Sequence, residues 1–199
     1  MSQTYSIPAK SVEASIEVKK SRFIARAAQA ASREEVMAFV EQARRDHPEA
    51  RHICWAYLLG NPASASNAGM NDDGEPSGTA GKPILNVIQH KAIGDIVVLV
   101  IRYFGGIKLG AGGLVRAYSG AAEAAVSTLP LEQLVPRSGR DIELEFAQEQ
   151  PVRHWVSIHD CKIDDVTYAE KVCISLDIAD SQLGEFEAFC QANGIRILD

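Results

Sequence analysis

The chain has 199 residues with a formal net charge of −6, and its composition is ordinary for a soluble globular protein. No apolar run approaches the roughly 20 residues that a membrane-crossing helix needs. The start, Met1–Lys10, lacks the basic and apolar regions of a secretory signal. The 4 cysteines are dispersed and include no C-x-x-C pair, which favours reduced thiols over disulfides or zinc. We therefore expect a cytoplasmic protein without membrane contact.

The charge is distributed unevenly along the chain. Residues 1–136 carry 14 Lys or Arg against 13 Asp or Glu, a net charge of +1, whereas residues 137–199 carry 6 against 13, a net charge of −7. RNA or another polyanion is therefore expected to contact the first part only. The acidic second part suits a protein partner or a spacer role.

The first predicted elements are two short strands within Ser15–Ala27, separated by a polar reversal that contains Lys20 and Arg22. These two cations either extend a basic face or belong to a solvated turn. A capping box, Ser32-Arg-Glu-Glu35, then opens a helix that ends at His47-Pro48, as proline requires.

The next predicted strand is Arg51–Leu59, which is apolar on both faces. His52 stands near its start and can act as a general base, or as a metal ligand beside Asp72, Asp73 or Glu75. The other interpretation is a structural histidine held by hydrogen bonds. Since no second histidine stands at ligand spacing, the pattern favours that structural role.

A long polar segment, Asn61–Gly81, is predicted as a surface loop, and loops of about 20 residues inside a compact domain are often functional. Its carboxylates can bind a divalent cation, but the glutamate that ends a calcium-binding EF-hand loop is absent, so we expect no metal. Instead, the acids are expected to anchor the loop against Arg102 or Arg116. Ser77 and Thr79 are expected to cap a helix that begins near Lys82-Pro83.

The central element is Ile96–Ile101, six consecutive apolar residues that indicate a strand buried on both faces. Arg102 follows where this strand is expected to leave the core. Five glycines between residues 105 and 113 then form a loop, and Leu114–Ala125 is predicted as a helix. A strand, a glycine loop and a helix N-terminus together make a natural anion site.

Arg102, Lys108 and Arg116 surround this loop and suit a phosphate group. Alternatively, the two arginines only pair with the acids of Asn71–Glu75. Two familiar phosphate fingerprints are absent, because the dinucleotide motif lacks its last glycine and Pro83 replaces the magnesium-binding hydroxyl of a nucleotide-hydrolase loop.

Turn residues and the charge change coincide near residues 131–138, so we place a domain boundary there, between domains 1–134 and 135–199. The second domain is predicted as β-α-β-β-α-β, the ferredoxin-like arrangement. Its elements are, in order, Asp141–Phe146, Gln150–His159, Lys162–Tyr168, Lys171–Ile178, Ser181–Ala192 and Ile195–Leu198.

Four segments together resemble the signature of the IMPACT/YigZ family: Asp72–Pro83, Arg102–Gly110, Gly113–Tyr118 and Lys20–Ile24. The resemblance implies a two-domain α+β protein. Its N-terminal α/β domain would be like the second domain of a small-subunit ribosomal protein, and its C-terminal ferredoxin-like domain like one in elongation factor G. Eukaryotic relatives regulate translation by binding an activator of a stress kinase, for which they use a different N-terminal domain. The family supplies no catalytic residues to carry over.

We therefore expect a non-enzymatic, translation-associated regulatory factor, without a cofactor, that binds RNA or the ribosome through its first domain. Tyr103 or Tyr118 is expected to stack on a base. The candidate ligand-binding and phosphate-binding residues are Lys20, Arg22, Arg51, His52, Asp73, Glu75, Ser77, Thr79, Lys82, Arg102, Tyr103, Lys108 and Arg116.

Two alternatives stay open. In the first, the protein is an enzyme acting on a small phosphorylated substrate, and His52, Asp73 and Glu75 supply acid–base or metal chemistry. In the second, it is a protein-interaction module that uses its acidic C-terminal domain.

Overall fold

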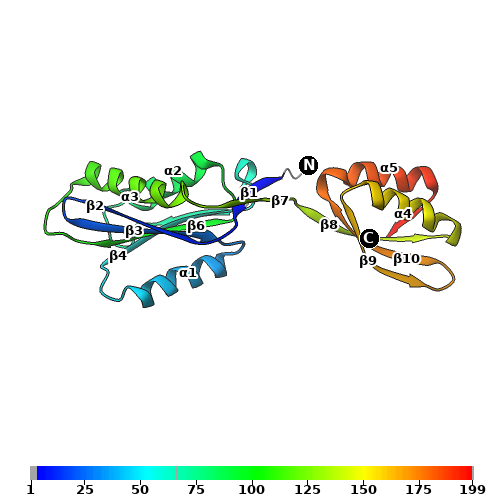
Figure 1. Cartoon of the computed structure of the whole chain (residues 1–199), viewed down its shortest axis with the longest axis horizontal. Coiled ribbons are helices and arrows are strands. Elements are labelled where there is room, and N and C mark those ends of the chain that lie inside the picture. The colour runs from blue at the N-terminus through cyan, green and yellow to red at the C-terminus, as the bar shows by residue number, and fades with distance from the viewer. Residues whose placement is uncertain (1–3, 66, 199) are drawn as a thin grey trace. The chain divides into compact units, whose positions relative to one another are not determined.

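The structure is a computed structural model that describes residues 4–65 and 67–198. These residues form two compact units, one comprising Tyr5–Leu134 and the other built from Thr4 and residues 135–198. Helices and strands are interleaved in both units, so the chain has the α+β fold that the sequence predicted (Figure 1). Among the described residues, no helix combines the length and apolar character needed to cross a membrane.

The first unit is built on an antiparallel 5-stranded sheet with the order β2-β3-β6-β4-β5. The central strand is β6, in agreement with the prediction from its apolar run. Its neighbours on one side, β2 and β3, form the hairpin predicted from the polar reversal. The strands are β2 (Val12–Val18), β3 (Ser21–Gln29), β4 (His52–Leu59), β5 (Asn67–Asn71) and β6 (Ile96–Tyr103).

Two features of this sheet differ from the sequence-based expectation. The segment predicted as one long loop contains β5, an edge strand that pairs with β4. Its residues Asn67–Asn71 are mostly exposed and show no apolar alternation, so the pattern contained no strand signal. A further short sheet pairs β1 (Tyr5–Pro8) with β7 (Leu131–Leu134).

Helices cover both faces of the central sheet (Figure 1). One face packs on α1 (Arg33–Asp46), and the other on α2 (Gly81–Lys91) and α3 (Ala111–Val126). Successive side chains of β6 alternate between these two cores, with Val98 in the α2/α3 core and Val97 in the α1 core. A strand covered on both faces can therefore be apolar at every position.

The helix starts follow from local hydrogen bonds. Ser32 caps α1 through its hydroxyl, which accepts from the Glu35 amide at 3.2 Å, as the capping box predicted. Helix α3 begins three residues earlier than the predicted Leu114, because the Leu114 amide already donates to the Gly110 carbonyl at 2.9 Å. The loop that precedes α3 is correspondingly shorter.

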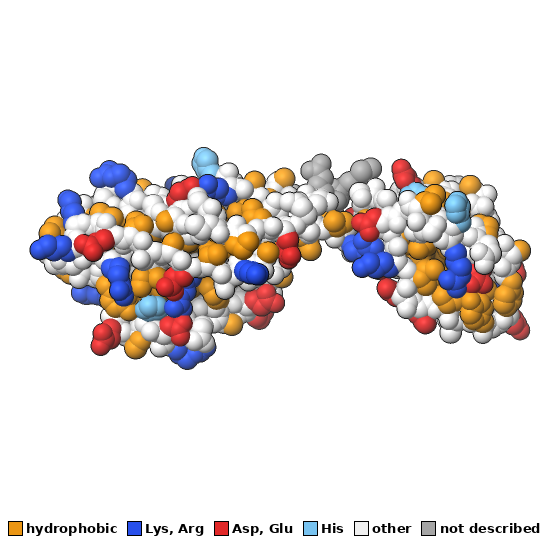
Figure 2. Space-filling model, in the orientation of Figure 1, with side chains coloured by type: hydrophobic (Ala, Val, Ile, Leu, Met, Phe, Trp, Pro, Cys, Tyr) orange, Lys and Arg blue, Asp and Glu red, His pale blue; other side chains and the backbone are white. Residues whose placement is uncertain are grey.

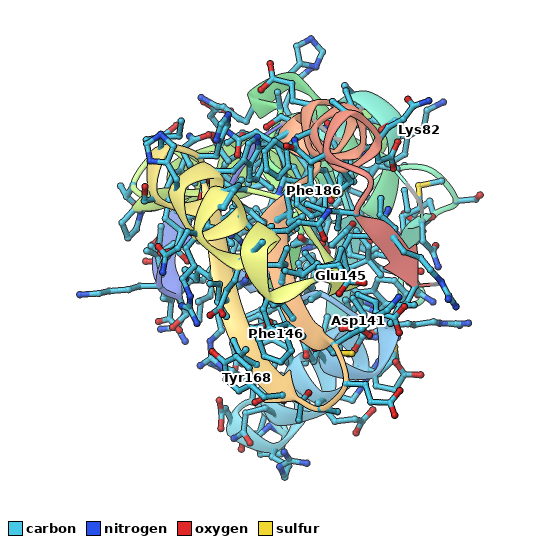
Figure 3. All side chains as sticks on the ribbon, turned by 90° about the vertical axis from the view of Figure 1, so that its right-hand side faces the viewer. Lys82, Asp141, Glu145, Phe146, Tyr168 and Phe186 are labelled. Atoms are coloured by element: carbon cyan, nitrogen blue, oxygen red, sulfur yellow. The ribbon has the colours of Figure 1, made fainter. Side chains whose placement is uncertain are left out.

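The second unit has the predicted ferredoxin-like β-α-β-β-α-β order, with an antiparallel sheet arranged β11-β8-β10-β9. Phe186 lies in its core, between the helices and the sheet, while Phe146 and Tyr168 stack on the outside with ring centroids 6.4 Å apart (Figure 3). The elements are β8 (Arg137–Leu144), α4 (Glu149–Ile158), β9 (Cys161–Tyr168), β10 (Val172–Ala179), α5 (Leu183–Asn193) and β11 (Arg196–Leu198).

Candidate functional site

The candidate site lies at the end of the central sheet where β6 stops. The strand register places Arg102 directly between Phe23 on β3 and His52 on β4. Because side chains alternate along a strand, Arg102 points to the same face as Val98, the face covered by α2 and α3. The expectation that Arg102 leaves the core is therefore wrong, since it lies within β6 and is only 7% exposed.

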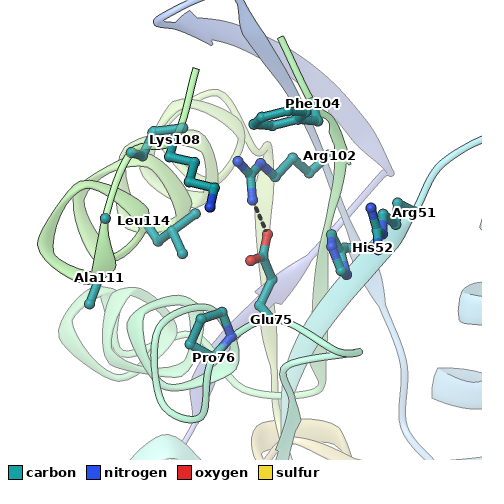
Figure 4. A pocket seen from close by; sticks show the side chains of 11 residues that line it. Arg51, His52, Glu75, Pro76, Arg102, Phe104, Lys108, Ala111 and Leu114 are labelled. Carbon is teal, nitrogen blue, oxygen red and sulfur yellow. Dashed lines mark hydrogen bonds and ion pairs between the residues drawn. The ribbon is translucent and has the colours of Figure 1, made fainter. Parts of the chain in front are cut away.

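A cavity of about 400 Å³ opens beside Arg102. Figure 4 shows that its walls come from the starts of β4 and α3, the end of β6, the turn after β5 and the loop before α3. The lining residues are Arg51, His52, Glu75, Pro76, Arg102, Phe104, Lys108, Leu109, Gly110, Ala111 and Leu114. Five of the predicted site residues, from four separate segments, thus meet at one pocket.

The innermost polar group of the pocket is the Glu75 carboxylate, whose side chain is 4% exposed. Its Oε1 accepts hydrogen bonds from Arg102 Nη1 at 2.5 Å and from the Tyr118 hydroxyl at 2.8 Å. This ion pair confirms that an acid of the predicted loop anchors it against Arg102. Within the described residues, however, the buried Arg102 Nε has no hydrogen-bond partner. Because Nη2 makes no hydrogen bond in the described chain either, Arg102 retains several N–H donors that the protein itself does not satisfy.

His52 is both hydrogen-bonded and exposed to the pocket. Its Nδ1 lies 2.8 Å from the Asp73 carbonyl oxygen. Because a carbonyl can only accept, Nδ1 carries the proton, and the neutral ring presents Nε2 as an acceptor. Nε2 has no partner among the residues that the structure describes. The hydrogen-bonded histidine expected from the sequence is thus also a free acceptor at the pocket wall.

The first turn of α3 supplies backbone donors to the same cavity. Gly110 precedes the helix with a φ of +73°, a conformation that glycine adopts without strain, and no side chain caps this end. The first helical bond is donated by Leu114. The amides of residues 111–113 consequently have no acceptor within the described chain, and they stand at the positive end of the helix dipole.

The side chains of the pocket are net positive. Three cations, Arg51, Arg102 and Lys108, face one carboxylate, Glu75, which gives a charge of +2 with His52 neutral. Arg51 and Lys108 are exposed and form no ion pair within residues 4–65 and 67–198. An uncapped helix N-terminus beside unpaired cations favours anion binding.

Further cations extend this region outward, as the Lys and Arg side chains at the left of Figure 2 show. We use the name basic end for the surface formed by Lys19, Lys20, Arg22, Arg51, Arg102 and Lys108. The backbones of the β2–β3 turn and the glycine loop approach each other closely there. A Cβ on Gly105 would lie 2.0 Å from the Lys20 carbonyl group. Only glycine permits this close approach of two backbones.

Asp73, a predicted site residue, is directed away from the pocket lining. Its Oδ1 accepts from Arg44 on α1 at 2.9 Å, and its Oδ2 accepts from the Ile53 amide at 2.7 Å. Both oxygens are therefore engaged in holding the turn. Asp73 is not among the lining residues of the cavity, unlike Glu75 two positions later.

The capping role expected for Ser77 and Thr79 belongs to Asp72. The Asp72 carboxylate accepts from the amides of Gly78, Ala80 and Gly81 at 2.8–3.0 Å. Thr79 instead donates its hydroxyl to the Pro76 carbonyl at 2.6 Å, and Ser77 is exposed. The prediction failed because the cap lies eight or nine residues away in sequence, beyond the usual local motif.

The remaining predicted residues lie outside the pocket. Lys82 is exposed on α2, and Arg116 lines a separate cavity of about 140 Å³ with Lys19. Tyr103 points to the α1 face, where its hydroxyl lies 2.9 Å from His47 Nδ1. Tyr118 is fully buried, so the expectation that it stacks on a base is wrong.

Phe104 is the functional candidate that the sequence reasoning missed. Its ring is 55% exposed at the pocket rim, and the Arg102 guanidinium carbon lies 5.5 Å from the ring centroid. An aromatic residue directly after a buried strand has no periodicity that distinguishes a binding role from packing. The exposure of the Phe104 ring at the pocket rim, which only the structure shows, favours the binding role.

Two other chemistries find little support in the described part of the chain. No group of three or more His, Cys, Asp or Glu that could hold a metal occurs among residues 4–65 and 67–198. Cys54 lies in the core and contacts the hydroxyl of Tyr118, but burial raises the pKa of its thiol to about 12, and the thiol donates to the Asp72 carbonyl. Because the thiolate is the nucleophile, Cys54 is unreactive near neutral pH.

Residues 19–126 match the family model described as the Impact N-terminal domain, and residues 142–189 match a domain of unknown function, DUF1949. IMPACT family member YigZ of Escherichia coli is 38% identical over 94% of this chain and 91% of its own length. An IMPACT family member of Haemophilus influenzae is 35% identical over 92% and 89%. A crystal structure of a hypothetical protein, 35% identical, superimposes with a TM-score of 0.74 over 100% of this chain and 98% of the other. The chain therefore belongs to the IMPACT family.

Proposed function

We propose that this IMPACT family protein is a translation-associated factor that binds RNA, free or in the ribosome, through phosphate contacts at the basic end. One observation carries the proposal: the uncapped start of α3 opens into the same cavity as Arg51 and Lys108, neither of which has an ion-pair partner in the described chain. Unpaired cations and free helix amides are the groups that proteins use to contact phosphate.

Family membership supports the translational part of the proposal, because the resemblance to the IMPACT family implies eukaryotic relatives that regulate translation. The charge split supports the same assignment, since residues 1–136 carry a net charge of +1 and residues 137–199 carry −7. A polyanion is thus attracted to the first unit and repelled by the second. Exposed Phe104 supplies a ring on which an unpaired base can stack.

Fluorescence anisotropy with a labelled single-stranded RNA tests the proposal on the full chain. The double variant Arg51→Ala/Lys108→Ala is expected to weaken binding by roughly tenfold or more, because two phosphate contacts are lost. The matched control, Lys10→Ala/Arg33→Ala, removes two exposed cations that lie outside the basic end. Equal affinities of the two double variants would contradict the proposal.

Co-sedimentation with ribosomes through a sucrose cushion extends the test to the assembled particle. The wild-type chain is expected to pellet with ribosomes at low salt, and Arg51→Ala/Lys108→Ala to remain in the supernatant. A chain that stays in the supernatant while still binding free RNA would limit the function to RNA outside the ribosome.

A second candidate function, an enzyme acting on a small phosphorylated substrate, is favoured by one observation. His52 Nε2 and Glu75 Oε2 line the same pocket, and neither has a partner in the described residues. Two proton acceptors in one cavity can take a proton from a substrate and return it. Turnover of a phosphorylated compound by the wild type, abolished in His52→Ala, would favour this function; Asp73→Ala is not expected to act directly.

A further inference from the structure

The inner wall of the pocket contains a buried donor without an acceptor. The Arg102 side chain is 8% exposed and extends into the cavity toward Glu75 (Figure 4). Its Nε has no hydrogen-bond partner among residues 4–65 and 67–198. Its Nη2 makes no hydrogen bond in the described chain either and, unlike Nε, keeps some accessible surface. A ligand that places an acceptor in this cavity therefore gains a bond to Arg102 that the protein alone does not make.

The start of α3 points to the same kind of ligand independently. The amides of residues 111–113 have no acceptor within the described chain, and Ala111 and Gly110 line the cavity. Lys108 projects toward the same space (Figure 4). Three kinds of donor, a guanidinium, an ammonium and backbone amides, therefore line one cavity at a helix N-terminus.

We propose that this pocket binds one nucleoside monophosphate unit, with its phosphate at the start of α3; this inference rests on the phosphate recognition proposed for the basic end. The net charge of +2 on the lining side chains matches a phosphomonoester, which carries nearly two negative charges near neutral pH. An internal phosphodiester carries only one.

The remaining residues of the pocket lining can contact the base and the sugar of such a ligand. Phe104, Leu109 and Leu114 form an apolar wall, and an exposed aromatic ring beside a phosphate site suits a stacked base. Glu75 Oε1 is occupied by Arg102 and Tyr118, which leaves Oε2 as an acceptor for a sugar hydroxyl. Inorganic phosphate would use neither the apolar wall nor this carboxylate oxygen.

The size of the cavity restricts how RNA can occupy it. About 400 Å³ falls within the range of small-molecule sites, which is enough for one nucleotide but not for several. The pocket therefore holds one nucleotide unit, and its charge of +2 favours a terminal phosphomonoester over an internal phosphodiester. The ligand is therefore either a free nucleotide or the phosphorylated end of an RNA chain.

Isothermal titration calorimetry of the full chain with adenosine 5′-monophosphate, adenosine and inorganic phosphate tests the proposal. The monophosphate is expected to bind at least about tenfold more tightly than either of its parts, because only it contacts both walls of the pocket. Equal binding of adenosine and the monophosphate, or absent binding of the monophosphate, would overturn the proposal.

The variant Ala111→Pro probes the helix end specifically. Proline is well tolerated at the first helical position, so the substitution removes one free amide donor while α3 is retained, which circular dichroism verifies. It is expected to weaken monophosphate binding roughly fivefold to tenfold and to leave adenosine binding unchanged. Lys108→Ala should act alike, and Lys10→Ala should have no effect. Wild-type affinity in Ala111→Pro would show that the phosphate lies elsewhere.

Two oligoribonucleotides that differ only at the 5′ end identify the source of the nucleotide. Tighter binding of the 5′-phosphorylated strand than of the 5′-hydroxyl strand supports an RNA end, and equal binding with retained affinity for the monophosphate supports a free nucleotide. If the 5′-hydroxyl strand binds but the monophosphate does not, this inference fails and the proposed function stands. If no RNA binds at all, the proposed function fails.

Discussion

Arg102 Nη1 donates to Glu75 Oε1 at 2.5 Å, and both side chains are at least nine-tenths buried at the end of the central sheet. This pair occupies only part of each group, because Arg102 Nε and Glu75 Oε2 have no partners in the described chain. The pair therefore positions a guanidinium in a cavity without consuming it. Lys108 and Arg51 at the same cavity are not paired at all within the described residues.

Removal of one partner of this ion pair is expected to destabilise the first unit. Glu75→Ala leaves the Arg102 guanidinium buried without a counter-charge and should lower the free energy of unfolding by about 3 kcal/mol. Urea unfolding measures the loss. Exposed Glu17, which forms no ion pair among the described residues, provides the control Glu17→Ala with a change near zero. Similar losses in both variants would contradict this account of the pair.

Asp72 is expected to link stability to acid pH. Burial opposes its ionisation, but the amides of Gly78, Gly81 and Ala80 outweigh burial and lower its pKa below the ordinary value of 3.8. A depressed pKa contributes stability above the unfolded pKa, and that contribution is lost as the pH falls through the folded pKa.

Asp72→Asn should therefore cost about 2 kcal/mol near neutral pH, and the difference from wild type should shrink below the unfolded pKa of 3.8. Urea unfolding across pH measures this difference. Asp141→Asn, an exposed carboxylate in the second unit, is the matched control and should show no such trend. A constant difference down to strongly acidic pH would show that Asp72 does not cap α2 as an anion.

Substitution by alanine at Gly105 and at Gly184 should change the free energy of unfolding in opposite directions. A Cβ at Gly105 would meet the Lys20 carbonyl group at 2.0 Å, so Gly105→Ala must separate the glycine loop from the β2–β3 turn. We expect a loss of about 2 kcal/mol or more in the free energy of unfolding. Gly184 lies in α5 with no atom within 4 Å of such a Cβ, and Gly184→Ala should stabilise by about 0.5–1 kcal/mol. Equal effects would contradict the close approach.

Cys54 should react with an alkylating reagent more slowly than half-buried Cys173. Burial raises the pKa of Cys54 to about 12, so its thiolate is scarce at mildly alkaline pH. Iodoacetamide labelling followed by peptide mass spectrometry measures both rates in one sample. Cys54 should react only after denaturation, and rapid native labelling of Cys54 would show that the core around it opens.

Elements that carry a continuous apolar run or a regular apolar alternation were predictable from the sequence, and elements with neither pattern were not. Ile96–Ile101 is apolar at every position because helices cover both sheet faces, whereas alternation in β10 reflects a sheet covered on one face. Strand β5 was missed because only its central residue, Gly69, is even half-buried. At such a sheet edge, pairing is specified by the neighbouring strand rather than by local pattern.

The site was predictable as a set of residue types but not as an arrangement. His52 and Arg102 meet because they are register partners on neighbouring strands, which depends on pairing that no single segment specifies. Asp73 and Arg116 do not line the pocket, and the reason differs for each residue. Asp73 turns toward Arg44, and Arg116 is about 200° around α3 from the pocket residue Leu114.

The salt dependence of RNA affinity tests the central claim most directly. If phosphate contacts at the basic end dominate, the logarithm of the affinity of the full chain for single-stranded RNA falls linearly with the logarithm of salt concentration. Lys108→Ala should lower the magnitude of that slope by about 0.7, the value expected for one contact, while Lys10→Ala leaves it unchanged. An affinity that does not change with salt, or an unaltered slope in Lys108→Ala, would contradict the account.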